Sequence, residues 1–305
     1  MRYGRRVRPG ARIGIVGVGN MGGRISRRIR DAGHEIAGYD RNPDQVAASG
    51  IPGAGSLGEL VTASDVLLFS LPDSKVVEAV VLGDDGVLAG CRSGQVVVDL
   101  STAAPHSTIR LHAELGARGA ELIDAGISGG AAAAEQGTLT IMAGGSETAL
   151  DGVRPLLETF ASRVYYMGAS GSGHTAKLLN NFLNGVSLAA TAEVMVAARK
   201  AGLNLHTFLD VVNNSSGVSF ATLNRFPRIV DGDYLEGGLT GNLMLKDLLL
   251  YIDLVRSLGA PTLNAAGPVA TFGLAAGLGY GEQISNRVVD ALGDVAGGIR
   301  LQEES

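Results

Sequence analysis

The chain has 305 residues, of which 46% are hydrophobic and 18% charged, which excludes a disordered protein and leaves room for one large or two ordinary domains. Its formal net charge of −5 argues against general nucleic-acid binding, because that function usually needs a strongly basic face. No apolar run approaches the length of a membrane span, and we expect no membrane partner. The basic N-terminus, with Arg5 and Arg6, is followed by only a short apolar run, which predicts a tail before the first strand and not a signal peptide.

Short apolar runs alternate with helical patterns in the first half of the chain. The runs DVLLFSL and QVVVDL are continuously apolar, which is typical of strands buried on both faces of a parallel sheet. The alternation indicates an α/β fold with a doubly wound parallel sheet. Strands are expected at 12–17, 34–40, 65–71, 95–100, 121–124, 139–142 and 164–166, and helices at 21–32, 74–81 and 105–119.

The pattern changes after Gly168. From 173 to 201 there is no proline, and apolar residues recur at helical spacing, which predicts one long helix. Further helices are expected at 205–212, 241–258 and 261–277, with no more strands. We therefore predict a dinucleotide-binding Rossmann domain over residues 1–167 and an all-helical substrate and dimerisation domain over 168–305, opened by the long interdomain helix.

A glycine-rich motif follows the first predicted strand. IGIVGVGNMG places Gly17, Gly19 and Gly22 in the G-x-G-x-x-G pattern between a strand and a helix. These glycines permit a tight turn, a close approach to a pyrophosphate and close helix packing. Asp40 ends the second strand, where a carboxylate can accept hydrogen bonds from ribose hydroxyls and favours NAD, whereas Arg41 could pair with the 2′-phosphate of NADP.

Two later motifs carry polar groups suited to a substrate. In DAGISGG, Ser128, Gly129 and Gly130 offer a hydroxyl and bare N–H groups that could hold a carboxylate, although the segment could equally be a flexible turn. In GSGHTAKLLNN, Lys177 and Asn181 are spaced i, i+4 and share one helical face. A desolvated lysine can transfer protons near neutral pH. From the spacing alone, Lys177 could equally be an ordinary solvated lysine on a long helix.

The motifs IGIVGVGNMG, LPDSKVVEAVV, DLST, DAGISGG with GTLTIMAGG, GSGHTAKLLNN and LMLKDLLL occur in an order and spacing that resemble the β-hydroxyacid dehydrogenase family, from about residue 12 to 290. That family includes 3-hydroxyisobutyrate dehydrogenases, tartronate semialdehyde reductases and relatives of 6-phosphogluconate dehydrogenase. The resemblance implies hydride transfer between NAD(P) and a small 3-hydroxy acid, with Lys177 as the catalytic residue. It implies substrate contacts from Ser128, Gly129, Gly130 and Asn181, and cofactor contacts from Gly17, Gly19, Asn20, Met21, Gly22, Asp40, Leu71, Pro72, Thr102 and Lys246, the last supported by Asp247.

The sequence departs from the family at two points. Many relatives have DAPVSGG, with proline where this chain has Gly126, so we expect a more mobile loop here. The 6-phosphogluconate enzymes typically have His-Asn where this chain has Asn180 and Asn181, and imine reductases usually lack the lysine. Both remain alternative activities on this fold, as does a non-catalytic dinucleotide-binding module.

The remaining expectations concern partners and compartment. The five histidines show no metal-ligand spacing, and His174 is expected to have a packing role at the start of the long helix. A single cysteine, Cys91, cannot form an internal disulfide and fits a reducing cytoplasm. The resemblance implies a homodimer or homotetramer. Substrate specificity is expected from the helical domain, near residues 215–220.

Overall fold

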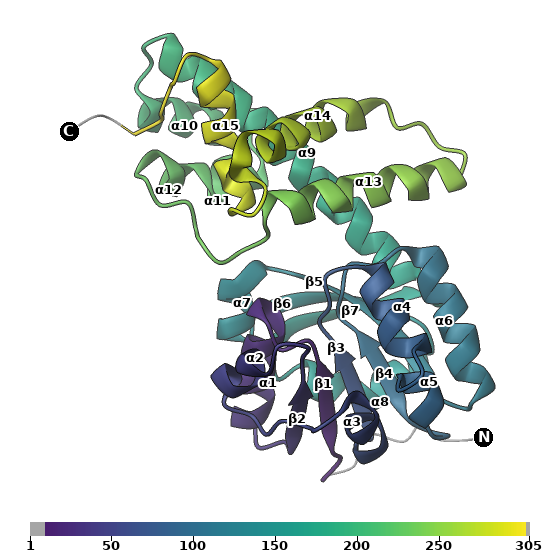
Figure 1. Cartoon of the computed structure of the whole chain (residues 1–305). Helices are drawn as coiled ribbons and strands as arrows, with labels where there is room; N and C mark the ends of the chain where they lie inside the picture. Colours follow the sequence, from purple (N-terminus) through teal and green to yellow (C-terminus); the bar gives the residue numbers. More distant parts are fainter. Residues whose placement is uncertain (1–9, 303–305) are drawn as a thin grey trace. The chain divides into compact units, whose positions relative to one another are not determined.

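Residues 10–302 are described by a computed structural model of the chain (Figure 1). The predicted basic tail, with Arg5 and Arg6, lies outside these residues. The chain divides into two compact units, the first ending at Lys177 and the second beginning at Leu178. Each unit has a hydrophobic core of its own.

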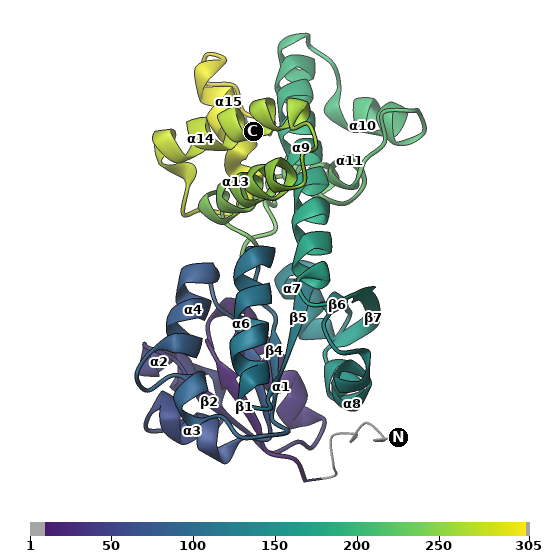
Figure 2. The same cartoon turned by 90° about the vertical axis from the view of Figure 1, so that its right-hand side faces the viewer.

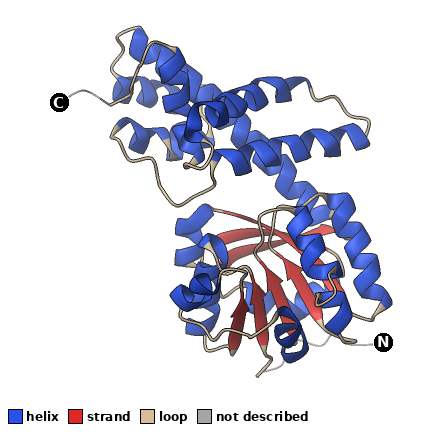
Figure 3. Ribbon diagram, in the orientation of Figure 1, coloured by secondary structure: helices blue, strands red, loops and turns tan. Residues whose placement is uncertain are grey.

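The first unit contains one sheet, of seven strands within the described residues, in the order β2-β1-β3-β4-β5-β6-β7 (Figure 3). The strands are β1 (Ile13–Val16), β2 (Ile36–Tyr39), β3 (Val66–Phe69), β4 (Val96–Asp99), β5 (Glu121–Ser128), β6 (Leu139–Gly144) and β7 (Ala161–Gly168). The first five are parallel, so their carboxyl ends meet at one edge. The predicted doubly wound parallel sheet is confirmed, and one strand pair departs from it: β6 pairs antiparallel to β5, and β7 then runs parallel to β6.

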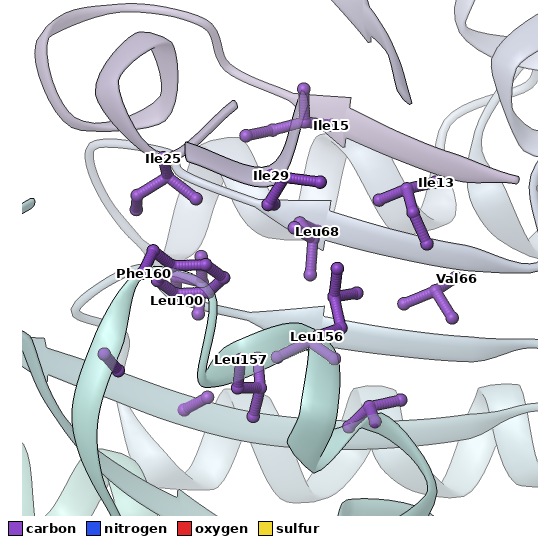
Figure 4. Close-up of a cluster of buried hydrophobic side chains, with 14 of the residues drawn as sticks. Ile13, Ile15, Ile25, Ile29, Val66, Leu68, Leu100, Leu156, Leu157 and Phe160 are labelled. Atoms are coloured by element: carbon purple, nitrogen blue, oxygen red, sulfur yellow. The ribbon is translucent and has the colours of Figure 1, made fainter. Parts of the chain in front are cut away.

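Helices cover both faces of this sheet. They are α1 (Asn20–Asp31), α2 (Pro43–Ser49), α3 (Leu57–Ala63), α4 (Ser74–Leu82), α5 (Val87–Gly90), α6 (Pro105–Ala117), α7 (Gly130–Gln136) and α8 (Glu147–Leu157). Alternate residues of β1 show why two layers form: Ile15 packs with Ile29 of α1 and Leu156 of α8 on one face, whereas Val16 belongs to the opposite cluster with α3 to α6 (Figure 4). Fully burying each such side chain contributes about 1.5–3 kcal/mol.

The long helix predicted after Gly168 is confirmed as α9 (Ser172–Lys200), a single unbroken helix that Figure 2 shows along its length. Its first turn belongs to the first unit and the rest to the second. The second unit continues with α10 (Leu205–Asn213), α11 (Phe220–Asn224), α12 (Phe226–Val230), α13 (Gly241–Ser257), α14 (Ala266–Ala275) and α15 (Val288–Val295). Its core includes Leu188, Phe226, Met244 and Phe272.

The helix predicted over 261–277 begins later than expected. A 3₁₀ turn (Leu263–Ala265) comes first, α14 follows, and a π turn (Ala276–Tyr280) ends the segment. Pro268 explains the late start, because a proline has no N–H to donate and is tolerated in the first turn of a helix. Across residues 10–302, no helix combines the length and apolarity that crossing a bilayer demands.

Candidate active site

The glycine-rich turn lies at the carboxyl end of β1. A Cβ at Gly17, where φ is +86°, would lie 2.3 Å from the carbonyl oxygen of Ser70, and one at Gly22 would lie 1.9 Å from that of Gly17. Both positions therefore exclude any side chain. A Cβ at Gly19 would have no other atom within 4 Å. Gly19 directly precedes α1 and offers no side chain to cap it. This open cradle at a helix N-terminus fits the pyrophosphate of a dinucleotide.

An open pocket adjoins this turn. It is lined by Val18, Gly19, Asn20, Gly23, Arg24, Arg27, Gln45, Ala48 and Ser49. Arg24 donates a hydrogen bond of 2.7 Å to the Asn20 carbonyl oxygen, and its guanidinium lies 3.4 Å from the Glu135 carboxylate. The two arginines give the pocket a positive lining, which suits an anionic ligand. The side chain of Met21, which is also predicted as a cofactor residue, packs against the buried cluster of Figure 4.

Asp40 ties this turn to the end of β2. Its Oδ2 accepts a hydrogen bond of 2.8 Å from the Val18 N–H, and its Oδ1 accepts one of 2.9 Å from the Asn42 N–H. The carboxylate therefore holds the loop that follows Gly17, in addition to the ribose contact that the sequence predicts. Arg41 is exposed beside it.

Replacing Asp40 by alanine is expected to weaken NADH binding by about 5- to 100-fold, because removing a charged hydrogen-bond acceptor from two backbone N–H groups costs roughly 1–3 kcal/mol. The loss of NADPH affinity should be smaller, since a carboxylate at this position repels a 2′-phosphate. Titration of cofactor fluorescence measures both. Asp44→Ala removes a nearby exposed carboxylate and is the matched control. Equal NADH affinities in the two variants would contradict this role for Asp40.

The residues predicted at the nicotinamide side follow β3 and β4. Leu71 and Pro72 come after β3, and Thr102 comes after β4, so all three lie at the sheet edge that also carries the glycine-rich turn. The Leu71 N–H donates to the Ser101 Oγ at 3.0 Å, which links the two loops. These loops fit the part of a dinucleotide that extends beyond the pyrophosphate.

Strand β5 ends in the predicted carboxylate loop. Ser128 is its last residue, and Gly129 and Gly130 have φ values of +129° and +71°. The prediction of a mobile loop at Gly126 was wrong, because Gly126 is buried within β5 and pairs with Met142. Lys177, on the first turns of α9, is 8% exposed, and its stem packs directly over Gly126.

Two buried groups hold the start of α9, and sequence reasoning missed the first of them, Asp124. Asp124, 0% exposed, accepts hydrogen bonds of 2.9 Å from the N–H groups of Gly171 and His174. His174 is also 0% exposed; its Nδ1 lies 2.7 Å from the Thr108 Oγ1 and its Nε2 lies 3.3 Å from the Asp99 carbonyl oxygen. Since a carbonyl oxygen only accepts, the His174 Nε2 is the donor in the contact with Asp99. The predicted packing role of His174 is thus confirmed.

Asn181 and Lys246 lie in the second unit, where a buried carboxylate joins them. The Asn181 Nδ2 donates to the Asp247 Oδ2 at 2.5 Å, and the Lys246 Nζ lies 3.1 Å from the Asp247 Oδ1. Asp247 is 1% exposed, so Lys246 and Asp247 are not a routine surface pair. The arrangement orients the Asn181 amide and fixes the Lys246 ammonium on α13.

Arg225 is a further cation of the second unit, half-buried, that sequence reasoning missed. Its guanidinium donates to the Oδ1 atoms of Asn286 and Asn184, at 2.8 and 3.0 Å, and lies 5.7 Å from the centre of the Phe220 ring. Burial lowers the pKa of Arg225 to about 10. Phe220 ends the segment predicted to set specificity and is 59% exposed.

Metal and thiol chemistry find no candidate centre in the described part of the chain. There, no three His, Cys, Asp or Glu side chains are grouped so that they could hold a metal ion. Cys91 is half-buried, with its Sγ 3.8 Å from the Leu88 carbonyl oxygen.

Two family models together match nearly the whole chain. Residues 12–168 match the NAD binding domain of 6-phosphogluconate dehydrogenase. Residues 171–289 match the model described as NAD-binding of NADP-dependent 3-hydroxyisobutyrate dehydrogenase. The two matches meet at the start of α9.

Individual proteins give the same result. The chain is 32% identical to 2-(hydroxymethyl)glutarate dehydrogenase of Eubacterium barkeri, over 91% of this chain and 93% of that protein. It is 34% identical to NAD-dependent L-serine dehydrogenase of Pseudomonas aeruginosa, over 89% and 94%.

Two solved structures resemble this chain to different degrees. The 3-hydroxyisobutyrate dehydrogenase of Mycobacterium tuberculosis, solved with L-serine, superposes with a TM-score of 0.83 at 31% identity and covers 93% of this chain and 99% of its own. An imine reductase from a Pseudomonas species has a TM-score of 0.61 at 20% identity, over 93% of this chain and 100% of its own, and shares the fold alone. The chain belongs to the β-hydroxyacid dehydrogenase family of NAD(P)-dependent oxidoreductases.

Proposed function

We propose that the chain transfers a hydride between NAD(P) and a small 3-hydroxy acid, with Lys177 as the general acid–base residue. The observation that carries the proposal is the burial of Lys177 against β5, the strand that ends in the Ser128 loop. Removing an amine from water disfavours its charged form, which suits a group that must take up and release a proton.

Three of the named relatives share one substrate class, whereas L-threonate, named for other relatives, has hydroxyls on the second and third carbons and no hydroxymethyl group on the second. 2-(Hydroxymethyl)glutarate, L-serine and 3-hydroxyisobutyrate each carry a hydroxymethyl group on the carbon that bears a carboxylate. We propose that the substrate of this chain has the same two groups on one carbon. Ser128, Gly129 and Gly130 then bind the carboxylate, and Lys177 faces the hydroxyl.

We assign a separate role to each of these residues. In oxidation, the neutral amine of Lys177 removes the hydroxyl proton, and in reduction its ammonium returns one. Asn181, oriented by Asp247, donates its amide to the substrate, and we assign Lys246, which pairs with Asp247, to cofactor binding. Bound at the glycine-rich turn, a nicotinamide cofactor supplies the hydride acceptor or donor. Asp40 supports a preference for NAD, with NADP as the second cofactor.

A panel of alcohols tests the proposal. The purified chain is mixed with NAD or NADP, and reduced cofactor is followed by absorbance with L-serine, 3-hydroxyisobutyrate, 2-(hydroxymethyl)glutarate, lactate and 6-phosphogluconate. We expect kcat/KM for at least one hydroxymethyl acid to exceed that for lactate by roughly 10-fold or more, because lactate places its hydroxyl one carbon nearer the carboxylate. Cofactor binding without turnover of any alcohol would favour a non-catalytic module. A separate assay supplies NADPH and a cyclic imine, and turnover of that imine but of no alcohol would favour an imine reductase.

The remaining assignments extend this proposal to the whole chain. We assign cofactor binding to residues 1–167 and substrate binding and dimerisation to 168–305, in a cytoplasmic homodimer or homotetramer. Large apolar side chains on α13 and the turn after it support self-association, since Leu249, Leu258 and Leu263 are 47%, 65% and 88% exposed. Sedimentation velocity measures the oligomeric state.

A further inference from the structure

Arg225 lies between α11 and α12, beside the middle of α9. The Ala221 N–H of α11 donates to the Ser187 Oγ of α9 at 3.3 Å, so these two helices lie side by side (Figure 2). The Arg225 guanidinium donates to the Oδ1 atoms of Asn286 and Asn184, at 2.8 and 3.0 Å. Both acceptors are neutral amide oxygens, and neither compensates the positive charge.

The charge of Arg225 has no carboxylate partner in the part of the chain that the structure describes. Arg228, Arg287 and Arg300, in the same unit, each pair with an aspartate. Burial, with no acid acting against it, lowers the pKa of Arg225 to about 10, so the guanidinium is still charged at neutral pH. A half-buried cation without a counter-ion is costly, and a bound anion would remove that cost.

This cation lies close to the part of α9 that we assign to the substrate. Lys177, Asn181 and Asn184 follow one another at i, i+4 and i+7, a spacing that keeps them on one helical face. Asn184 lies about 4.5 Å along the helix axis beyond Asn181. Asp247 holds the Asn181 amide, and Asn184 in turn accepts from Arg225. A substrate longer than three carbons could therefore extend from Asn181 toward the guanidinium.

We propose that Arg225 binds a second carboxylate of the substrate, remote from the reacting hydroxyl, and so makes the chain selective for hydroxymethyl diacids. This inference rests on the proposed function and deepens it. A guanidinium pairs with a carboxylate through parallel hydrogen bonds, and the described residues accept from only two of its five N–H groups. The exposed Phe220 ring, 5.7 Å from the guanidinium, offers apolar surface to the methylene carbons between the two carboxylates.

A matched pair of substrates tests the charge. 2-(Hydroxymethyl)glutarate carries a second carboxylate, and the same compound with that distal carboxylate replaced by a carboxamide has nearly the same shape but no charge there. We expect kcat/KM of the unchanged chain to be about 10-fold or more higher for the diacid, because a hydrogen bond between two charged groups contributes more than one to a neutral amide. The difference should lie in KM, since a remote contact is made equally in the ground state and the transition state.

Arg225→Gln removes the charge but keeps an amide that can donate to a neighbouring asparagine. Its kcat/KM for the diacid should fall to about the value for the carboxamide, whereas the values for the carboxamide and for 3-hydroxyisobutyrate should change by no more than a few-fold. Arg225→Lys keeps a cation and should keep part of the preference. Arg228→Gln is the matched control, because it removes an exposed arginine three residues along the chain and should leave the preference unchanged.

A second measurement does not depend on turnover. Glutarate and its monoamide, neither of which can be oxidised at a hydroxyl, are titrated into the chain with NADH present and followed by calorimetry. Glutarate should bind the unchanged chain about 10-fold more tightly than the monoamide does, and added salt should reduce the difference. The two ligands should bind Arg225→Gln with equal affinity.

The outcomes separate the two proposals. Equal kcat/KM for the diacid and the carboxamide in the unchanged chain, a result that requires no variant to fold, overturns the role of Arg225 and leaves the proposed function intact. A preference for the diacid that persists in Arg225→Gln also overturns it, as do equal losses for all three substrates, which a purely structural arginine would produce. A chain that oxidises no hydroxy acid refutes the proposed function, and the glutarate titration then decides whether Arg225 binds a carboxylate.

Discussion

Replacing Lys177 by alanine is expected to lower kcat by about 10²–10⁴-fold, the usual contribution of a positioned proton-transfer group. NADH affinity should change little, because Lys177 lies on α9, whereas the glycine-rich turn follows β1 and Asp40 follows β2. Steady-state kinetics with the best acid of the panel, together with cofactor titration, measure the two effects separately.

Two further variants make the Lys177 result specific. Lys177→Arg keeps a positive charge, but a guanidinium stays protonated at all working pH values, so it cannot serve as the base and should remain as slow as alanine. Lys75→Ala removes an exposed lysine of α4 and should be fully active. Turnover within a few-fold of the unchanged chain in either Lys177 variant would remove this residue from the reaction.

The sheet could be predicted from sequence where local pattern determines structure. DVLLFSL and QVVVDL became β3 and β4 because strands buried on both faces need continuous apolar runs. The direction of a strand could not be predicted in this way. The antiparallel pairing of β5 with β6 depends on a tight connection through the short helix α7, and that connection leaves no periodic pattern in the sequence. Helix α8 also went unpredicted: Ser146 caps its start, but Pro155 lies inside it and interrupts the helical pattern.

Site residues could likewise be predicted only where a local sequence pattern marks them. Gly17, Gly19 and Gly22 could be found because their spacing, the strand before and the helix after are all local. Asp124 could not, because its partners Gly171 and His174 lie 47 and 50 residues away and become neighbours only when α9 packs on β5. The motif DAGISGG did contain one clue, since an aspartate within a buried strand needs hydrogen-bond donors from another element for its carboxylate.

Gly22→Ala is the second large effect, and it differs in kind from Lys177→Ala. The added methyl would lie 1.9 Å from the carbonyl oxygen of Gly17 and 3.2 Å from the Ser70 Cβ, so the turn itself must deform. Overpacking of this kind costs about 1–3 kcal/mol of unfolding free energy. We expect the thermal midpoint of the free chain to fall by several degrees, and kcat/KM by roughly 10²-fold, because a turn displaced by about 1 Å presents its N–H groups wrongly to the cofactor.

Gly19→Ala distinguishes fold from function at this turn. No atom lies within 4 Å of a Cβ built at Gly19, so the free chain should unfold at the same temperature as the unchanged one. Only a bound pyrophosphate would meet the added methyl, and NADH affinity should therefore fall while stability does not. Calorimetry without cofactor and fluorescence titration with NADH measure the two quantities. Normal NADH binding by Gly19→Ala would show that the pyrophosphate does not approach the chain at Gly19. Unchanged stability of Gly22→Ala would show that the turn accommodates the added methyl group without deforming.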